Sequence, residues 1–384
     1  MKKLVLLLVI AVSCNGFAQK MKDSILSKKL DKYRQLSVSL PKSYNKDSKK
    51  TYPLLFLLDG DYLFEPFQGA ISYGNYWDDL PEVIIVGLDQ NKDNERTDDC
   101  TFDQSTGLPE GKGESFFEFI GGELLPFLQN KYRISPFKII AGHDVTAGYM
   151  NLFLYKDNPL FNAYISLSPE LATEMEVRVA ERLATFKQNI FYYQSSADGD
   201  IKKMRTKITT LDENIKAVTN PSLNYKYDDF KGASHYSLVL YSIPSALYQF
   251  FASYQPISTS EFQEKIVKLE SGYVDYLKNK YDVLEKALGI KMSIRLNDFK
   301  AIEAAILKNK AYGEFEQLAQ LSRKMYPKSM LGDYHMAMYY ENTGDIKNAV
   351  KYYQNGFQMQ EIGDLTKDMM LGKADELRGQ IKKK

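Results

Sequence analysis

The sequence predicts an α/β domain, with a mostly parallel sheet covered by helices, followed by an all-α domain. From about residue 32 to 252, short β-rich runs alternate with stretches of helical periodicity, a pattern typical of a parallel sheet between helices. Beyond residue 260 no strand candidate remains and the pattern is helical. The 384 residues, 44% of them apolar, are enough to build two hydrophobic cores.

The first domain contains seven candidate strands, each a short β-rich run. They are residues 34–40, 52–58, 82–88, 137–142, 163–168, 189–195 and 223–229. Between them, three segments have helical periodicity. These are residues 114–128, 146–155 and 202–218. We therefore assign residues 19–252 to an α/β domain.

The amino-terminal segment has the pattern of an export signal. Two lysines precede an apolar run over residues 4–12, and small residues around Ala18 supply a cleavage site. The apolar run is too short to span a bilayer. We expect residues 1–18 to be a signal peptide and the protein to be periplasmic or secreted. No later segment is apolar enough to be transmembrane.

The chain has two cysteines, Cys14 and Cys100. An alternative to a cleaved signal peptide is a lipoprotein in which Cys14 is lipidated, although Ala11 stands where such signals usually have leucine. Cleavage after Ala18 leaves Cys100 alone, so no disulfide can form within the mature chain. With three histidines and no zinc-like spacing, we expect no metal site and no cofactor.

A polar stretch over residues 253–260 is predicted to be a linker, so residues 261–384 form a separate helical domain. Part of this domain has the spacing of a tetratricopeptide hairpin. The residues concerned are Tyr340, Gly344, Ala349, Tyr353 and Gly356. A second, poorer copy, with a plain helical extension as its alternative, contains Phe315, Ala319, Ser322 and Pro327. Two copies are too few for a free solenoid, so we expect this domain to pack on the first or bind a protein partner.

The charges nearly cancel, with 50 basic and 49 acidic residues and a formal net charge of +1. No basic stripe stands out, and the terminal lysines are typical of a solvated chain end. Nucleic acid is therefore excluded as an expected partner.

The motif that bears most on function is Gly-His-Asp-Val-Thr-Ala-Gly at residues 142–148. An apolar run over residues 137–141 leads into it and a helical stretch over residues 149–155 follows. Strand, sharp turn and helix form the context of a hydrolase nucleophile elbow, in which Gly-x-Ser-x-Gly presents a serine above the sheet edge. In this chain the presented side chain is that of Asp144.

Five further segments have a familiar order and spacing. They are YPLLFLLDGD at residues 52–61, VIIVGL at 83–88, RTDD at 96–99, LFNAYISLSP at 160–169 and SHYSL at 234–238. With the elbow, these segments resemble the esterase family that includes esterase D and the enterochelin esterases. The resemblance covers most of the first domain and implies the α/β-hydrolase fold and a carboxylic ester or other acyl compound as ligand.

The resemblance also implies roles for particular residues. His235 falls on the general-base histidine of the family. Asp198 falls on the acid that orients it, with Asp200 as the alternative. The chain order of elbow, acid and histidine is that of α/β-hydrolases. Backbone N–H groups of Val145 and Asp61 fall on the oxyanion hole.

The elbow itself departs from the family pattern of Gly-x-Ser-x-Gly-Gly. Asp144 replaces the serine, Thr146 the first following glycine and Ala147 the second. A carboxylate attacking an ordinary ester would form a high-energy mixed anhydride, and His235 cannot activate a group that is already ionised. The first interpretation is therefore an esterase-like protein that is catalytically impaired or repurposed for binding.

Two active-enzyme interpretations remain open. In one, Asp144 attacks an alkyl carbon, as in epoxide hydrolases and dehalogenases, whose elbow Gly142-His143-Asp144 resembles. In the other, ester hydrolysis proceeds through water, with Asp144 or His235 as the base and no covalent intermediate.

Overall fold

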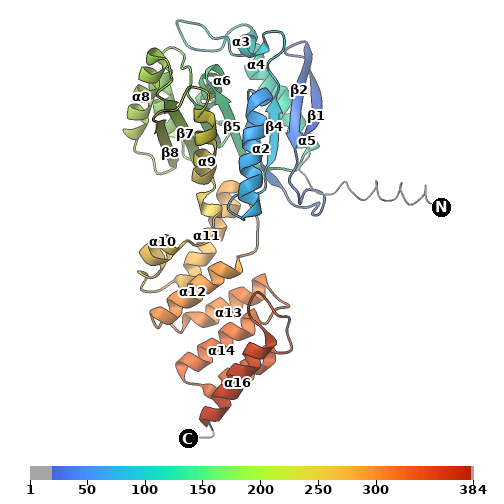
Figure 1. The fold of residues 1–384 in the computed structure, drawn as a ribbon, viewed down its shortest axis with the longest axis vertical. Helices are drawn as coiled ribbons and strands as arrows, with labels where there is room; N and C mark the ends of the chain where they lie inside the picture. Colours follow the sequence, from blue (N-terminus) through green and yellow to red (C-terminus); the bar gives the residue numbers. More distant parts are fainter. Residues whose placement is uncertain (1–19, 382–384) are drawn as a thin grey trace, which may run out of the picture. The chain divides into compact units, whose positions relative to one another are not determined.

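The computed structural model describes residues 20–381 and divides the chain into two compact units (Figure 1). The first unit extends to Tyr254 and includes Lys286–Ile290, and the second holds Gln255–Glu285 and the residues from Lys291 onward. The predicted signal peptide, with Cys14, lies outside the described residues. Among residues 20–381, no helix combines the length and the apolar character needed to cross a membrane.

The first unit is built on one eight-stranded sheet with the order β1-β2-β4-β3-β5-β6-β7-β8. The strands are β1 Met21–Ser27, β2 Lys32–Ser39, β3 Tyr52–Leu57, β4 Ile84–Leu88, β5 Ile134–His143, β6 Ala163–Leu167, β7 Ile190–Ala197 and β8 Leu223–Phe230. β1 pairs with β2, and β2 with β4, in antiparallel fashion, while all other pairs are parallel. The predicted α/β fold class is confirmed.

Helices cover both faces of this sheet. They are α2 Gly60–Tyr76, α3 Glu95–Asp99, α4 Lys112–Phe119, η1 Ile120–Leu124, α5 Leu125–Lys131, α6 Val145–Tyr149, η2 Met150–Tyr155, α7 Met175–Thr185, α8 Lys202–Lys216, α9 Leu238–Phe250 and η3 Ala252–Tyr254. In Figure 1, α2 and α9 lie side by side on one face. The opposite face packs on α4, α5, α7 and α8, whose apolar residues join those of the strands in one buried cluster.

The central strands are apolar throughout because both faces are covered. In β3 all six residues are buried, and Phe56 joins the cluster beneath α4 and α7. Burial of such continuous apolar runs is the main force that holds the sheet between its helices.

The carboxyl ends of the parallel strands meet at one edge of the sheet, which is where open α/β sheets bind ligands. Asp59 follows β3, Asp144 follows β5, Ser168 follows β6 and Asp200 lies just beyond β7. Four strands separated widely in the sequence thus bring polar side chains to one place.

The second unit is helical. Its elements are α10 Thr259–Glu261, η4 Phe262–Ile266, most of α11 Tyr273–Leu288, α12 Leu296–Lys308, α13 Glu314–Met325, α14 Leu331–Thr343, α15 Ile346–Gly356 and α16 Lys367–Ile381. Gly344 ends α14 with a φ of 90°, a left-handed conformation that suits glycine. Ala349 and Tyr353 of α15 are buried. This helical hairpin lies where the spacing predicted one, and its assignment as tetratricopeptide-like stays a prediction.

Candidate active site

The turn between β5 and α6 has the sharp backbone of a nucleophile elbow. Asp144 lies at its tip with φ 63° and ψ −123°, a backbone conformation that residues other than glycine rarely adopt. Its N–H donates to the carbonyl of Leu167 at 3.0 Å, and its carbonyl accepts from the N–H groups of Gly148 and Glu170, each at 3.0 Å. These three bonds hold the turn in place. A Cβ at Gly148 would lie 1.8 Å from the Glu170 carbonyl oxygen, so only glycine fits there.

Thr146, which stands where the family has glycine, does not disrupt the elbow. Its side chain is fully buried, and its hydroxyl donates to Oδ2 of Asp59 at 2.5 Å and accepts from the N–H of His143 at 3.0 Å. The added bulk therefore does not prevent strand and helix from packing, because the hydroxyl is satisfied on both sides.

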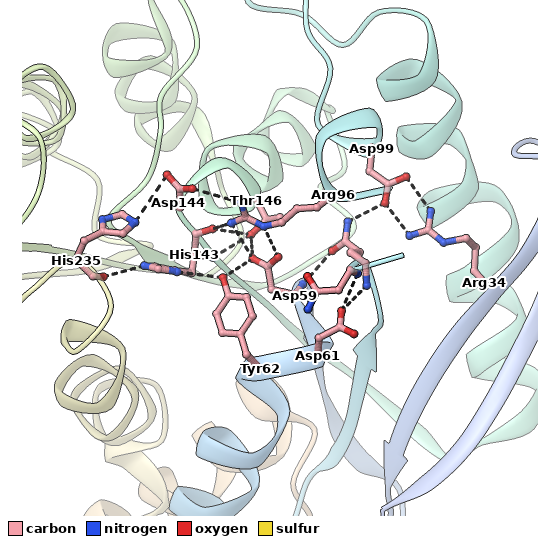
Figure 2. Close-up of polar contacts among 12 residues, drawn as sticks. Arg34, Asp59, Asp61, Tyr62, Arg96, Asp99, His143, Asp144, Thr146 and His235 are labelled. Atoms are coloured by element: carbon pink, nitrogen blue, oxygen red, sulfur yellow. Dashed lines mark hydrogen bonds and ion pairs between the residues drawn. The ribbon is translucent and has the colours of Figure 1, made fainter. Parts of the chain in front are cut away.

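Asp59 is the buried centre of the polar network in Figure 2. Its Oδ1 accepts from Nε of Arg96 at 2.6 Å, and its Oδ2 accepts from Thr146. Its backbone N–H donates to the side chain of Gln90 at 2.9 Å. Burial opposes the charge on Arg96, but the hydrogen bond and charge of Asp59 raise the pKa of the guanidinium above its ordinary value. Arg96 therefore remains a fixed cation beside the elbow.

His235 pairs with Asp200 and not with Asp198. Nδ1 of His235 lies 2.7 Å from Oδ1 of Asp200. The carboxylate of Asp200 also accepts from the hydroxyl of Ser168 at 2.9 Å and the N–H of Ala197 at 2.8 Å. Burial alone would raise the pKa of Asp200, but these hydrogen bonds hold it below its ordinary value.

The first choice for the orienting acid, Asp198, is corrected by this geometry. Its carboxylate accepts from Arg205 and from the N–H of Gly232, each at 2.8 Å, on the exposed side of the loop. The acid at the histidine is the residue named as the alternative, Asp200.

The Asp144 carboxylate lies between an imidazole and a guanidinium. Its Oδ1 is 3.9 Å from Nε2 of His235, and its Oδ2 is 3.4 Å from Nη1 of Arg96 (Figure 2). About a quarter of the Asp144 side chain, 26%, is exposed, so a ligand can reach it. The elbow, acid and histidine thus come together as a triad in which a carboxylate occupies the position of the serine.

A second histidine links this triad to helix α2. Nε2 of His143 lies 3.0 Å from the carbonyl oxygen of His235, which can only accept, so Nε2 carries the proton. The hydroxyl of Tyr62 lies 3.0 Å from Nδ1 of His143 and 3.0 Å from Oδ2 of Asp59, and it can donate its one proton to only one of them. Burial, followed by the nearby His235, lowers the pKa of His143 and keeps it neutral. This histidine therefore positions the backbone of His235 instead of taking part in proton transfer.

The two residues expected to supply oxyanion donors both lie in first helical turns. Val145 begins α6, and Asp61 is the second residue of α2. Segment 60–61 is thus the start of a helix. The carboxylate of Asp61 accepts from the N–H groups of Gln90 and Asn91, at 2.5 Å and 3.1 Å, which fixes the start of α2 against the segment after β4.

Metal-ligating residues and the remaining cysteine complete the description of this unit. No group of three or more His, Cys, Asp or Glu residues between 20 and 381 is placed to hold a metal ion. Cys100 is buried, and burial raises the pKa of its thiol well above the ordinary value, which disfavours a reactive thiolate.

Two contributors to the site were missed as functional residues, Asp59 and Arg96. Asp59 and Arg96 lie within segments that carried the family resemblance, but their partners are remote in the sequence. Asp59 is 87 positions from Thr146, and Arg96 is 48 positions from Asp144. The only signal available in the sequence was the presence of charged residues directly after apolar strands.

The strand order, the elbow and the histidine–acid pair define a protein of the α/β-hydrolase fold with an esterase-type site. The model of the family described as "Putative esterase" matches residues 27–236, more than half of the chain. The chain belongs to this family.

Solved structures with the same fold extend the comparison. An uncharacterised protein from Capnocytophaga ochracea is 29% identical, with a TM-score of 0.85 over 94% of this chain and 100% of that one. An IroE-like serine hydrolase from Shewanella oneidensis is 18% identical, with a TM-score of 0.60 over 80% of this chain and 99% of that one. The BES protein from Bacillus cereus is 22% identical, with a TM-score of 0.52 over 61% and 95%. None of the curated proteins matched the chain.

Proposed function

We propose that this protein is an exported member of the esterase family that binds a small acyl or ester ligand without forming an acyl-enzyme. One observation carries the proposal: the tip of the elbow holds a carboxylate between His235 and Arg96, at 3.9 Å and 3.4 Å. An ester carbonyl gains nothing from attack by this group, because the mixed anhydride formed would be less stable than the ester.

The strained backbone of Asp144 supports a binding role over simple decay of the site. A side chain at φ 63° and ψ −123° costs about 1–3 kcal/mol compared with a relaxed conformation. A side chain in such a position is expected to have a use, and at 26% exposure the use of this one is contact with a ligand. The carboxylate accepts hydrogen bonds, so a ligand carrying a hydroxyl or amide donor next to its acyl group suits the site.

The test compares the native protein with single variants on an aryl acetate. We expect no hydrolysis above buffer for the native protein or for Asp144→Ala. Asp144→Ser should gain esterase activity, since His235 and Asp200 are already paired at 2.7 Å. The double variant Asp144→Ser/His235→Ala is the control and should lose that gain. Hydrolysis by the native protein that disappears in Asp144→Asn would sink the proposal.

A second candidate function is hydrolysis without a serine, and the His235–Asp200 bond favours it. That pair holds the imidazole as a general base would require. Two routes are distinguishable by a single turnover in ¹⁸O-labelled water, using epoxides, haloalkanes and esters as substrates. Attack by Asp144 on an alkyl carbon, followed by hydrolysis of the alkyl-aspartate, places ¹⁸O in the Asp144 carboxylate. Direct attack by water leaves that carboxylate unlabelled.

Export is part of the proposal and rests on the amino-terminal pattern alone. The intact mass of protein recovered from its native host should correspond to a chain that begins at Gln19. A diacylglyceryl adduct on Cys14 would instead indicate a lipoprotein.

A further inference from the structure

The helical unit contains a pocket that is lined by residues of this unit. Helices α12 and α14, the start of α16 and the segment before α16 enclose a volume of about 300 Å³. Its walls are largely apolar, with contributions from Phe299, Leu331, Ile362 and Leu365. Two groups able to accept a hydrogen bond, Glu303 and His335, line the same pocket.

His335 is fully buried in a position that leaves one ring nitrogen unsatisfied. Its ring lies between Phe299 and Phe315, with centroid distances of 6.0 Å and 6.3 Å. Nδ1 lies 2.8 Å from Oγ of Ser322, and the Ser322 hydroxyl donates to the carbonyl of Leu318. The serine oxygen therefore accepts, and the ring proton is on Nδ1.

His335 is one of the residues that line the pocket, and its unsatisfied ring nitrogen is Nε2. Among the described residues it has no hydrogen-bond partner. Leaving a buried polar atom unpaired costs about 1–3 kcal/mol, and an apolar residue between two phenylalanine rings would avoid that loss. The arrangement points to a hydrogen-bond donor that the chain itself does not supply.

Glu303 provides the charge at this end of the pocket. Its Oε2 lies 3.5 Å from Nε2 of His335, and its Oε1 accepts from the hydroxyl of Tyr334 at 3.2 Å. Its side chain is 19% exposed, so a ligand in the pocket can touch it. At the rim, Lys300 is paired with Asp364 at 2.5 Å, which offsets the positive charge of the lysine. The pocket therefore combines apolar walls with a carboxylate and an imidazole that both accept.

We propose that this pocket binds a primary amine attached to a compact apolar body. The ammonium group donates to Glu303 and directs a second N–H toward Nε2 of His335, while the apolar body contacts Phe299 and Leu365. An ammonium carries three donors and no acceptor, which matches two acceptors 3.5 Å apart. The proposal does not depend on the function of the esterase-type site.

Phenethylamine is the probe for the test, with the full chain labelled by ¹⁵N at histidine. The protein has only three histidines, and two of them, His143 and His235, lie at the esterase-type site. His143→Gln and His235→Gln assign their imidazole signals, which leaves that of His335. We expect phenethylamine to shift the His335 signal in a saturable manner and to leave the other two unchanged. If saturating phenethylamine shifts only the His143 or His235 signals, or shifts no histidine signal, the proposal is overturned.

Two comparisons test the charge. Glu303→Gln should weaken phenethylamine binding about tenfold or more, because a charge-assisted hydrogen bond is lost while the shape is kept. Glu316→Gln on the exposed side of α13 is the matched control and should bind as the native protein does. Equal affinity in Glu303→Gln overturns the proposal. If Glu303→Gln fails to fold, the native protein can be tested with the neutral analogue 2-phenylethanol instead. We expect 2-phenylethanol to bind more weakly than phenethylamine, and equal affinity for the two compounds refutes the proposal.

Discussion

Replacing Asp144 by glycine should stabilise the α/β unit. The backbone at this position has φ 63° and ψ −123°, which glycine adopts freely. Release of the strain contributes about 1–3 kcal/mol. The greater freedom of glycine in the unfolded chain takes back about 0.4–1 kcal/mol. The contacts of the carboxylate with Arg96 and His235 are partly exposed and are worth about 0–1 kcal/mol in total.

Asp144→Ala is the matched control, since alanine loses the same carboxylate contacts but keeps a strained Cβ. The two variants should therefore differ by about 1 kcal/mol in favour of glycine, once strain release and unfolded-state entropy are combined. For a unit of this size, that difference corresponds to about 2–4 °C in Tm. Differential scanning calorimetry of the full chain measures it, with the transition of the α/β unit identified as the one that both variants shift.

A Tm of Asp144→Gly that is equal to or lower than that of Asp144→Ala would contradict the prediction. Such a result would mean that the elbow is held without strain at its tip. Retention of the aspartate side chain would then cost no conformational energy and would not indicate a use.

Three further predictions concern the polar and buried groups around the site. Asp200→Asn should lower the free energy of unfolding at neutral pH. Because the folded pKa of Asp200 is held below its ordinary value, the difference in unfolding free energy between the variant and the native protein should disappear as the pH falls below about 4. Urea titrations at several pH values measure this difference, and a difference that persists at low pH would contradict the prediction. The Cys100 thiol should resist iodoacetamide in the native protein and react after denaturation, because burial raises its pKa; mass spectrometry detects the adduct, and labelling of the native protein would contradict this. Arg34→Met should destabilise the α/β unit by about 3–5 kcal/mol, because Arg34 is fully buried and donates two hydrogen bonds to Asp99. If urea unfolding shows that the free energy of unfolding falls by less than about 1 kcal/mol, the pair is not important for stability.

Much of the fold could be predicted from the sequence because the central strands are continuous apolar runs. Several elements were missed, and two of them, β1 and α2, show the physical reasons. β1 is an edge strand in which only Ser27 is buried, so its sequence lacks the burial signal. Helix α2 contains Pro66, Gly69 and Gly74 after its first turn, and these residues weaken any helical prediction. Its helical form depends on packing against the sheet, where Phe64 and Phe67 are buried.

The candidate site was predictable in its composition but not in its pairing. Asp198 and Asp200 are residues of the same type in the same loop, and nothing local indicates which carboxylate turns inward. The turn after β7 decides this, because the N–H of Ala197 donates to Asp200. In the sequence, Thr146 is only a departure from the glycine of the family pattern. Its hydrogen-bond partner Asp59 is distant in the chain and is brought close by the pairing of β3 with β5.

The strained tip of the elbow has a consequence for the history of the chain. A single base change converts an aspartate codon into a glycine codon, so mutation supplies the more stable residue readily. A population without need of the carboxylate would drift toward that glycine, and the drift would be favoured by folding. The residue at position 144 therefore acts as an indicator of selection: among relatives with the same elbow, aspartate should persist where the site still binds its ligand and give way to glycine where that need has ended.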